Sequence, residues 1–216
     1  MKKLFTTLIG AWMISLTIGY ASSSSPALKS SLSSIGVTES LETIKALSGI
    51  EKKYGSNVES HYKRYQETQD DYKRVEEKFK SENVPLFFSL IPYTESHFKP
   101  RARGPGTAGL WQFTILSAHN FGLSIQKGKD ERFDIDLSTD AAIRCLKSLK
   151  KEFGSWYLAD FAYGMGEGTL RKLIEKNKSN KISVLLNDPS FPSGTKSHFA
   201  ETLLLDGEVH YSKTVE

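Results

Sequence analysis

Apolar residues recur every three or four positions over much of the chain, which is the pattern of amphipathic helices. Between residues 61 and 80, one helix face is formed by Tyr62, Tyr65, Tyr72, Val75 and Phe79. The same spacing predicts further helices over 41–50, 139–153, 156–163 and 169–176. No convincing alternation of apolar and polar residues is found, so the sequence predicts a mainly α fold that leaves room for a small sheet.

The segment 86–91, Leu-Phe-Phe-Ser-Leu-Ile, is too apolar for a surface helix and predicts a central, buried one. Pro85 suits the first turn of this helix, and Pro92 is expected to bend it. Its continuation brings Glu95 to the end of a buried element. A carboxylate in that position is costly unless it serves a purpose.

Glu95 is therefore the first candidate for chemistry. Its expected neighbours are Phe88, Tyr93, Phe98 and Trp111. An apolar setting disfavours the charged form of a carboxyl group, and a glycosidase needs a protonated acid for its leaving oxygen. The structural alternative is a helix-end glutamate that pairs with Lys99 or Arg101, and position alone does not separate the two.

The first 21 residues have the pattern of a secretory signal peptide. Lys2 and Lys3 form a basic start, residues 4–20 carry no charge, and Ala21 offers a cleavage position. The apolar run is about 17 residues long against the roughly 20 that span a bilayer, so we expect cleavage rather than a retained anchor. No cysteine follows the run to carry a lipid anchor. We expect export to the periplasm or cell envelope.

The charge balance does not favour a nucleic-acid partner. The formal net charge is +4, and removal of Lys2 and Lys3 with the signal would halve this excess. Basic residues are scattered among acidic ones, as in residues 73–78, which is typical of a solvated helix face.

Several other reactive or aromatic residues have structural interpretations. Cys145 is the one cysteine and lies in an apolar helical pattern, which predicts a buried thiol rather than a nucleophile. Trp111 and Trp156 are expected in the core rather than stacked on a sugar. The histidines show no metal-ligand spacing, so neither a metal nor a cofactor is expected. They are His61, His97, His119, His198 and His210.

Four sequence blocks resemble the soluble lytic transglycosylase (SLT) domain, and most closely the membrane-bound lytic murein transglycosylase D group. In family order they are 84–98, which contains Pro-Tyr-Thr-Glu-Ser-His-Phe; 109–113, Gly-Leu-Trp-Gln-Phe; 130–142, which opens on Asp-Glu-Arg-Phe-Asp; and 156–168, which contains Ala-Tyr and Gly-Glu-Gly. A weaker match covers 192–203. One block alone is weak evidence, but four in the same order argue against chance.

The resemblance implies a lysozyme-like helical fold, as in goose-type lysozymes and SLT domains. It implies cleavage of the MurNAc-β-1,4-GlcNAc bond of peptidoglycan, with Glu95 as the catalytic acid and base. Gln112 and Tyr163 match residues that face the substrate, Gln112 in the sugar groove and Tyr163 with its hydroxyl near the glutamate. Ser96 follows the catalytic residue and is counted with Gln112 and Tyr163 as a substrate-binding residue, although its expected role is a hydrogen bond at the helix end.

The implied chemistry needs one carboxyl group rather than the usual glycosidase pair. Glu95 would protonate the glycosidic oxygen, and the C6 hydroxyl of muramic acid would attack C1 to give a 1,6-anhydro sugar. Glu131 and Asp134 are therefore not needed as a second catalyst. Together with Arg132, they are expected to form a structural turn or ion pair.

This sequence departs from the family pattern at several positions. Gly104 stands where a serine is common, Thr114 where methionine is, Gly164 where asparagine follows the tyrosine, and Gly194 where a groove glutamate is expected. Each change removes an expected substrate contact or a rigidifying residue. These positions bear on substrate binding and turnover rather than on the fold.

Two alternatives to the transglycosylase stay open. A muramidase would cut the same bond with water, and a second carboxylate in the groove would favour it. A peptidoglycan-binding or scaffold protein would fit the altered positions, although a binding protein gains little from a desolvated Glu95. Peptidoglycan strands are the expected partner in every case, and the sequence indicates no protein partner.

The expected domain organisation has five parts. They are a signal peptide over 1–21, a serine-rich flexible linker with a short helix over 22–58, a helical extension over 59–82, the lysozyme-like catalytic domain over 83–205 and a tail over 206–216. The linker assignment rests on the serine content of residues 22–40, which offer little apolar surface to bury.

Overall fold

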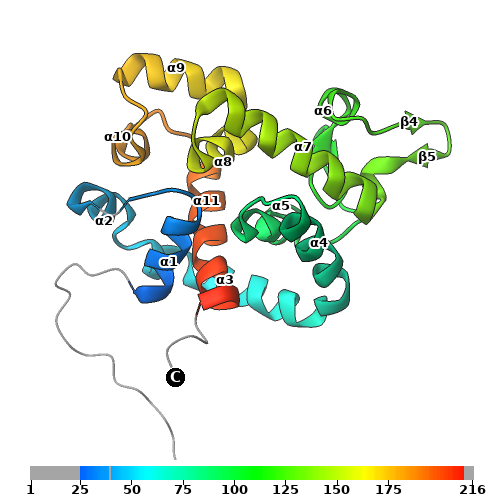
Figure 1. Cartoon of the computed structure of the whole chain (residues 1–216), viewed down its shortest axis with the longest axis horizontal. Helices are drawn as coiled ribbons and strands as arrows, with labels where there is room; N and C mark the ends of the chain where they lie inside the picture. Colours follow the sequence, from blue (N-terminus) through cyan, green and yellow to red (C-terminus); the bar gives the residue numbers. More distant parts are fainter. Residues whose placement is uncertain (1–24, 39, 212–216) are drawn as a thin grey trace, which may run out of the picture.

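The computed structural model describes residues 25–38 and 40–211, and in this part of the chain it confirms the predicted mainly helical fold (Figure 1). The α-helices are α1 (Pro26–Ser34), α2 (Leu41–Leu47), α3 (Ile50–Glu67), α4 (Gln69–Ser81), α5 (Ile91–Ser96), α6 (Ile115–Asn120), α7 (Ile135–Phe153), α8 (Trp156–Met165), α9 (Glu167–Asn177), α10 (Ile182–Asn187) and α11 (Ser193–Asp206). Shorter helical turns are η1 (Leu86–Leu90), η2 (Glu131–Phe133) and η3 (Gly207–Tyr211).

The strands are very short and form two small antiparallel sheets. The first sheet has the order β1 (Arg103–Gly104), β2 (Thr107–Ala108) and β3 (Phe113–Thr114). The second pairs β4 (Ile125–Gln126) with β5 (Lys129–Asp130). In the first sheet Ala108 lies opposite Arg103 on one side and Phe113 on the other, so residues 103–114 are folded back on themselves.

Helix α11 runs through the middle of the molecule and packs against α1, α3, α5 and α8 (Figure 1). Its buried residues include Phe199 and Leu203, but also polar side chains. The buried polar residues of this helix are Thr195, His198, Glu201, Thr202 and Asp206. A central helix with so many buried polar groups must find partners for them, since an unpaired buried polar group is costly.

The predicted linker over 22–40 is wrong for the described residues 25–38, which contain helix α1. Ser25 caps the helix by accepting a hydrogen bond from the N–H of Leu28. Leu28, Leu32 and Ile35 are buried, and the Ser31 hydroxyl donates to Asp206 at 2.6 Å. The serine content hid a helix because one of these serines has its partner on α11, far along the sequence.

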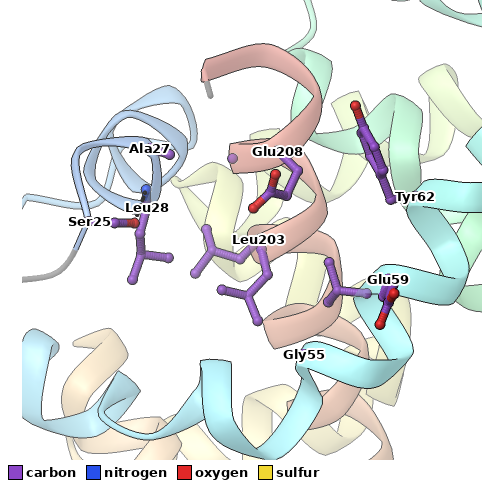
Figure 2. Close-up of a pocket in the computed structure, with 11 residues that line it drawn as sticks. Ser25, Ala27, Leu28, Gly55, Glu59, Tyr62, Leu203 and Glu208 are labelled. Carbon is purple, nitrogen blue, oxygen red and sulfur yellow. Dashed lines mark hydrogen bonds between the residues drawn. The ribbon is translucent and has the colours of Figure 1, made fainter. Parts of the chain in front are cut away.

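A cavity of about 440 Å³ lies where α1, α3, α11 and η3 meet (Figure 2). Figure 2 shows Ala27 and Leu28 on one side of it, Glu59 and Tyr62 on the other, and Leu203 between them. The serine-rich segment is therefore part of the packed structure and helps to form this hollow.

The helix predicted over 61–80 is interrupted at Thr68, which separates α3 from α4. Thr68 has φ −121° and ψ 24°, outside the helical range. Its hydroxyl donates to the carbonyl oxygen of Arg64 at 2.8 Å and accepts from the Tyr93 hydroxyl at 2.8 Å. The break turns the chain, and the predicted apolar face continues on both sides of it.

The predicted buried helix over 86–91 is a 3₁₀ turn, η1, followed by the short helix α5. Pro92 lies in the first turn of α5, where a missing N–H is tolerated, so the expected bend at Pro92 is wrong. The burial prediction is confirmed for Phe87, Phe88 and Leu90, each fully buried.

The residues assigned to a tail are wrong for 206–211, because Asp206 ends α11 and the next five form η3. The His210 imidazole lies 2.7 Å from the Asp206 carboxylate and 3.1 Å from the Tyr72 hydroxyl. Buried apolar residues form one continuous core from Leu28 to Leu205, so the proposed extension and the catalytic domain share a core.

The predicted signal peptide over 1–21 lies outside the described residues. Within residues 25–38 and 40–211, no helix is long and apolar enough to span a membrane.

Candidate active site

Glu95 lies near the end of α5, where the backbone turns sharply. His97 and Phe98 both adopt left-handed conformations, with φ of 53° and 51°. The N–H of Phe98 and the hydroxyl of Ser96 both donate to the carbonyl oxygen of Pro92, each at 2.9 Å. The expected hydrogen bond of Ser96 at the helix end is confirmed, and it fixes the turn that carries Glu95.

Helix α3 holds this turn from outside. The Arg64 guanidinium donates to the carbonyl oxygen of His97 at 3.2 Å and reaches that of Phe98 at 3.5 Å. The Phe98 ring stacks on Tyr93 with centroids 4.6 Å apart. A six-residue helix has little stability of its own, so these contacts from α3 and the core keep Glu95 in place.

The Glu95 side chain is 27% exposed, so it faces solvent more than the sequence suggested. Phe88, Tyr93 and Phe98 lie in the core beneath it. The ion pair that Glu95 makes among the described residues is with His198, not with Lys99 or Arg101.

Glu95 borders two hollows, one of about 410 Å³ and one of about 290 Å³. We call the first, with Thr107, Gln112 and Tyr163, the sheet side of the site. We call the second, with Thr94 and His198 and with Asp160 behind His198, the helix side. The sequence predicted Gln112 and Tyr163 of the sheet side, and it missed His198 and Asp160 of the helix side.

On the sheet side, Gln112 is held by its own loop. It has a left-handed backbone with φ 50°. Its side-chain oxygen accepts from the Thr107 hydroxyl at 2.7 Å, and its side-chain nitrogen donates to the carbonyl oxygen of Gly109 at 2.7 Å. The structure therefore brings Gln112 to the hollow beside Glu95 with its amide already oriented.

Tyr163 reaches the same hollow from α8. Its hydroxyl donates to the carbonyl oxygen of Trp111 at 2.6 Å. Burial of the hydroxyl, together with the negative charge of Glu95, raises the pKa of Tyr163 well above its ordinary value. Tyr163 thus stays a neutral hydrogen-bonding group near Glu95 rather than an acid.

The loop before Gln112 depends on Gly109. This residue has φ 85°, and a Cβ there would lie 1.9 Å from the carbonyl oxygen of Arg132. Arg132 is buried, donates to the carbonyl oxygen of Phe113 at 3.1 Å and pairs with Asp130 at 2.7 Å. The hydrogen bond from Arg132 lowers the pKa of Asp130.

The charged residues of the block that begins at Asp130 have structural roles, as predicted, although the ion-pair partner of Arg132 is Asp130. Glu131 accepts from the N–H of Ser124 at 2.8 Å. Asp134 caps α7 by accepting from the N–H of Leu137 at 2.9 Å. None of these three carboxylates lines either hollow beside Glu95 in the described part of the chain.

On the helix side, His198 of α11 lies between two carboxylates. Its Nδ1 is 3.1 Å from Glu95 Oε1, and its Nε2 is 3.6 Å from Asp160 Oδ1. Nδ1 also lies 3.0 Å from the Thr94 hydroxyl. Asp160 of α8 is fully buried, and His198 is 8% exposed.

The charge of His198 follows from this setting. Burial by itself lowers the pKa of His198, but attraction to the Asp160 and Glu95 carboxylates outweighs burial and raises the pKa to about 10. The imidazole is therefore protonated at neutral pH, next to the candidate acid.

Sequence reasoning could have found this pair. Asp160 stands in the apolar run Leu-Ala-Asp-Phe-Ala of α8, and a charged residue there requires a buried partner. His198 falls within the weakly matching segment 192–203 and faces α8 only because α11 crosses the molecule.

The departures from the family pattern lie around the same two hollows. A Cβ at Gly104 would lie 2.5 Å from the Thr107 hydroxyl, so Thr107 occupies the space where a residue-104 side chain would begin. A Cβ at Gly164 would lie 3.1 Å from a methyl carbon of Thr195, whereas Gly194 faces open space. Gly164 and Gly194 both border the helix-side hollow.

The structural interpretations of the tryptophans and the thiol are confirmed. Trp111 is 1% exposed, stacks on Phe79 and donates to the Thr139 hydroxyl at 3.1 Å. Trp156 is partly buried against Phe88. Burial raises the pKa of Cys145 to about 12, so it is not a nucleophile at neutral pH.

Comparison with known proteins gives a family match over part of the chain. The family model "Transglycosylase SLT domain" matches residues 71–186, which include Glu95, Gln112 and Tyr163. The chain is 35% identical over 136 residues to "Membrane-bound lytic murein transglycosylase D" of Escherichia coli strain K12, and equally to that of strain O6:H1 CFT073. These matches cover 62% of this chain but only 30% of each relative.

A further relative, from Alteromonas sp. strain M-1, bears a name that refers to tributyltin chloride resistance. It is 38% identical over 104 residues, which is 46% of this chain and 50% of that protein. The chain thus corresponds to at most half the length of the relatives compared.

Proposed function

Because the chain belongs to the transglycosylase SLT domain family, we propose that it is a lytic transglycosylase that cuts the MurNAc-β-1,4-GlcNAc bond of peptidoglycan. One observation carries the proposal. Glu95 of α5, Gln112 of the turn between β2 and β3, and Tyr163 of α8 border the same hollow. All three also fall within the segment that matches the family.

We assign the chemistry to Glu95 as both acid and base. A partly exposed carboxyl group between two hollows can reach an oxygen in a bound glycan strand. Glu95 would give its proton to the glycosidic oxygen, and the bond from that oxygen to C1 breaks. The C6 hydroxyl of the same muramic acid attacks C1 and returns its proton to Glu95, which leaves a 1,6-anhydro end. The nucleophile is tethered, so the step is intramolecular.

The other predicted residues would orient the strand. Gln112 is held by Thr107 and Gly109, so its amide is preorganised toward the groove. Tyr163 is neutral and donates its proton to the carbonyl oxygen of Trp111, so its hydroxyl would accept a hydrogen bond from the strand. Ser96 bonds within its own helix, so its contribution would be to hold the end of α5 rather than to bind sugar directly.

A muramidase is the second candidate, and one observation favours it. Glu167 borders the sheet-side hollow and Glu201 borders the helix-side hollow, so each shares a hollow with Glu95. An inverting hydrolase places a second carboxylate where it can activate water. Glu201 is engaged by His61 and Asn57, at 3.0 Å each, which leaves the exposed Glu167 as the stronger candidate base.

We also propose a location in the cell envelope. The E. coli relatives are named as membrane-bound murein enzymes, and the proposed substrate lies outside the cytoplasmic membrane. Cleavage of a signal peptide after Ala21 and residence in the periplasm remain predictions from the sequence.

The test is product analysis on intact peptidoglycan. The purified protein and the Glu95→Gln variant would be incubated with peptidoglycan, and released fragments would be identified by mass spectrometry. We expect anhydro-muramyl ends from the wild type and a loss of roughly 10²- to 10⁴-fold in Glu95→Gln, the usual contribution of a general acid.

Glu175→Gln is the matched control, because Glu175 is an exposed glutamate on α9. It should retain full activity. New reducing ends in place of anhydro ends would support the muramidase, and their loss in Glu167→Gln would identify its base. Binding without any cleavage would instead leave a peptidoglycan-binding protein.

A further inference from the structure

A chain of three ionisable groups runs from the helix-side hollow into the core. Glu95 of α5 faces the hollow, His198 of α11 lies behind it, and Asp160 of α8 is innermost. Exposure falls along the chain, with side chains 27%, 8% and 0% exposed. The order places a buried acid behind a histidine, and the histidine behind the proposed catalytic acid.

Asp160 accounts for the charge of His198. Neither oxygen of Asp160 has a hydrogen-bond partner among the described residues, and 3.6 Å to His198 Nε2 is an ion-pair distance. A lone buried carboxylate would be strongly disfavoured, so the imidazolium supplies the compensating charge. Asp160 and His198 therefore form a neutral pair inside the protein.

The outer nitrogen of His198 is aimed at the proposed catalytic acid. The Thr94 hydroxyl donates to the carbonyl oxygen of Ile91 at 2.9 Å, so it is free to accept from His198. The N–H on Nδ1 therefore donates to Thr94 at 3.0 Å, and Glu95 Oε1 lies 3.1 Å from the same nitrogen, at ion-pair distance. This arrangement fixes both the position of the ring and the direction of its proton.

Resting on the proposed function, we propose that His198, held as an imidazolium by Asp160, is a positioning residue that orients Glu95 and stabilises its carboxylate after proton donation. The proton of Glu95 passes to the glycosidic oxygen and is replaced by that of the C6 hydroxyl. His198 keeps its own proton throughout, so the proton count closes over one turnover. Negative charge develops on Glu95 in the transition state, where a fixed cation is most effective.

The glycines of this hollow make the role of His198 understandable. Gly164 and Gly194 border it and offer no side chain to Glu95. Among the described residues of the helix side, the side chain that forms an ion pair with Glu95 is His198 of α11.

Other titratable groups face the cluster from each packed element. Burial by itself raises the pKa of Glu201 of α11. The interactions with His61 of α3 and, to a smaller extent, the charge of His198 outweigh burial and lower this pKa. Burial, together with the negative charges of Glu95 and Asp160, raises the pKa of Tyr163 of α8, so Tyr163 remains neutral. Because Glu201 is already paired with His61 at 3.0 Å, the pH response assigned below to His198 should not depend on Glu201.

The first measurement is the protonation of His198 by NMR of the ring nitrogens in the full-length protein, assigned by comparison with His198→Gln. We expect both nitrogens protonated at pH 7.5 in the wild type and ordinary titration of the ring in Asp160→Asn. A neutral ring at pH 7.5 in the wild type would overturn the proposal, whether or not the protein has any activity.

The second measurement is the pH profile of glycan cleavage. His198→Gln should lower the maximal rate by roughly 10- to 100-fold, the range expected for the loss of one charged partner. Removal of a cation beside the proposed catalytic carboxyl group should also move the alkaline limb of the profile to higher pH. A merely structural role would lower the rate without moving this limb.

Two further variants keep the outcome decisive. The double variant Asp160→Asn/His198→Gln replaces the buried ion pair by two neutral amides, so no lone buried charge is left to disturb folding. Its pH profile should show the same shifted alkaline limb as that of His198→Gln. Ser193→Ala, an exposed position on α11, should leave rate and profile unchanged.

If the wild type does not cleave, the proposed function fails. If cleavage depends on Glu95 but the His198→Gln profile is unaltered, only the present inference fails.

Discussion

The two sides of Glu95 are built from different kinds of interaction. The sheet side is held by neutral hydrogen bonds. Those of Gln112 join residues three and five positions apart, to Gly109 and from Thr107, and that of Tyr163 reaches Trp111, 52 positions away. The helix side is held by charges, and Thr94 and His198 are 104 positions apart. The sheet side can set the shape of a groove, whereas the helix side places a charge next to the acid between them.

The largest effect should come from breaking the sheet side at its backbone. Gly109→Ala should lower the free energy of unfolding by about 4 kcal/mol or more, because the new Cβ would collide with the carbonyl oxygen of Arg132. Gly128→Ala is the matched control, since Gly128 has the same φ of 85° but open space around it. It should cost only about 1–2 kcal/mol for the backbone conformation. Urea denaturation measures both, and equal losses would contradict the packing argument.

Breaking the helix side should have a smaller effect that depends on pH. The pKa of His198 is raised to about 10, against about 6.5 for an unfolded histidine. As pH rises, the unfolded chain releases this proton first, so the stabilisation is complete below pH 6.5 and is lost as pH approaches 10. Asp160→Asn should therefore cost about 3 kcal/mol at pH 6 and clearly less at pH 10.

Denaturation of the wild type and Asp160→Asn at pH 6, 8 and 10 tests this dependence. Asp70→Asn, at an exposed aspartate of α4, provides the control and should show no comparable trend. A constant difference between wild type and Asp160→Asn across this range would mean that the imidazolium is not the partner of Asp160.

The smallest effect should come from removing one neutral hydrogen bond on the sheet side. Thr107→Val keeps the side-chain shape but leaves the Gln112 oxygen without its donor, which should cost about 1 kcal/mol, or roughly fivefold in cleavage rate. The pH profile should not move, because no charged group is touched. Thr169→Val, at an exposed position of α9, is the control. A shifted pH profile in Thr107→Val would remove the distinction between the two sides.

The same difference explains what could be predicted from the sequence. Gln112 and Tyr163 were found because each stands in a short block whose residues and spacing resemble the family. Helix α7 was predicted because its apolar residues repeat along one continuous segment. Such local patterns depend on neighbours in the chain, which a sequence shows directly.

Several of the missed features depend on distant partners. Ser31 looks like a linker residue until its hydroxyl meets Asp206, and Asp160 looks misplaced until His198 lies beside it. Leu28, Leu32 and Ile35 did carry a usable signal, since their spacings of four and three fit a helix face. The serine content of that segment obscured it.

The central place of α11 also has a consequence for the timing of assembly. This helix follows α1, α3, α5 and α8 in the chain, yet it packs against all four. Those helices therefore emerge during synthesis before the element that covers their inner faces exists. A nascent chain that already contains Glu95 still lacks the helix that brings His198 to it, so the acid is made early and its buried cation arrives late.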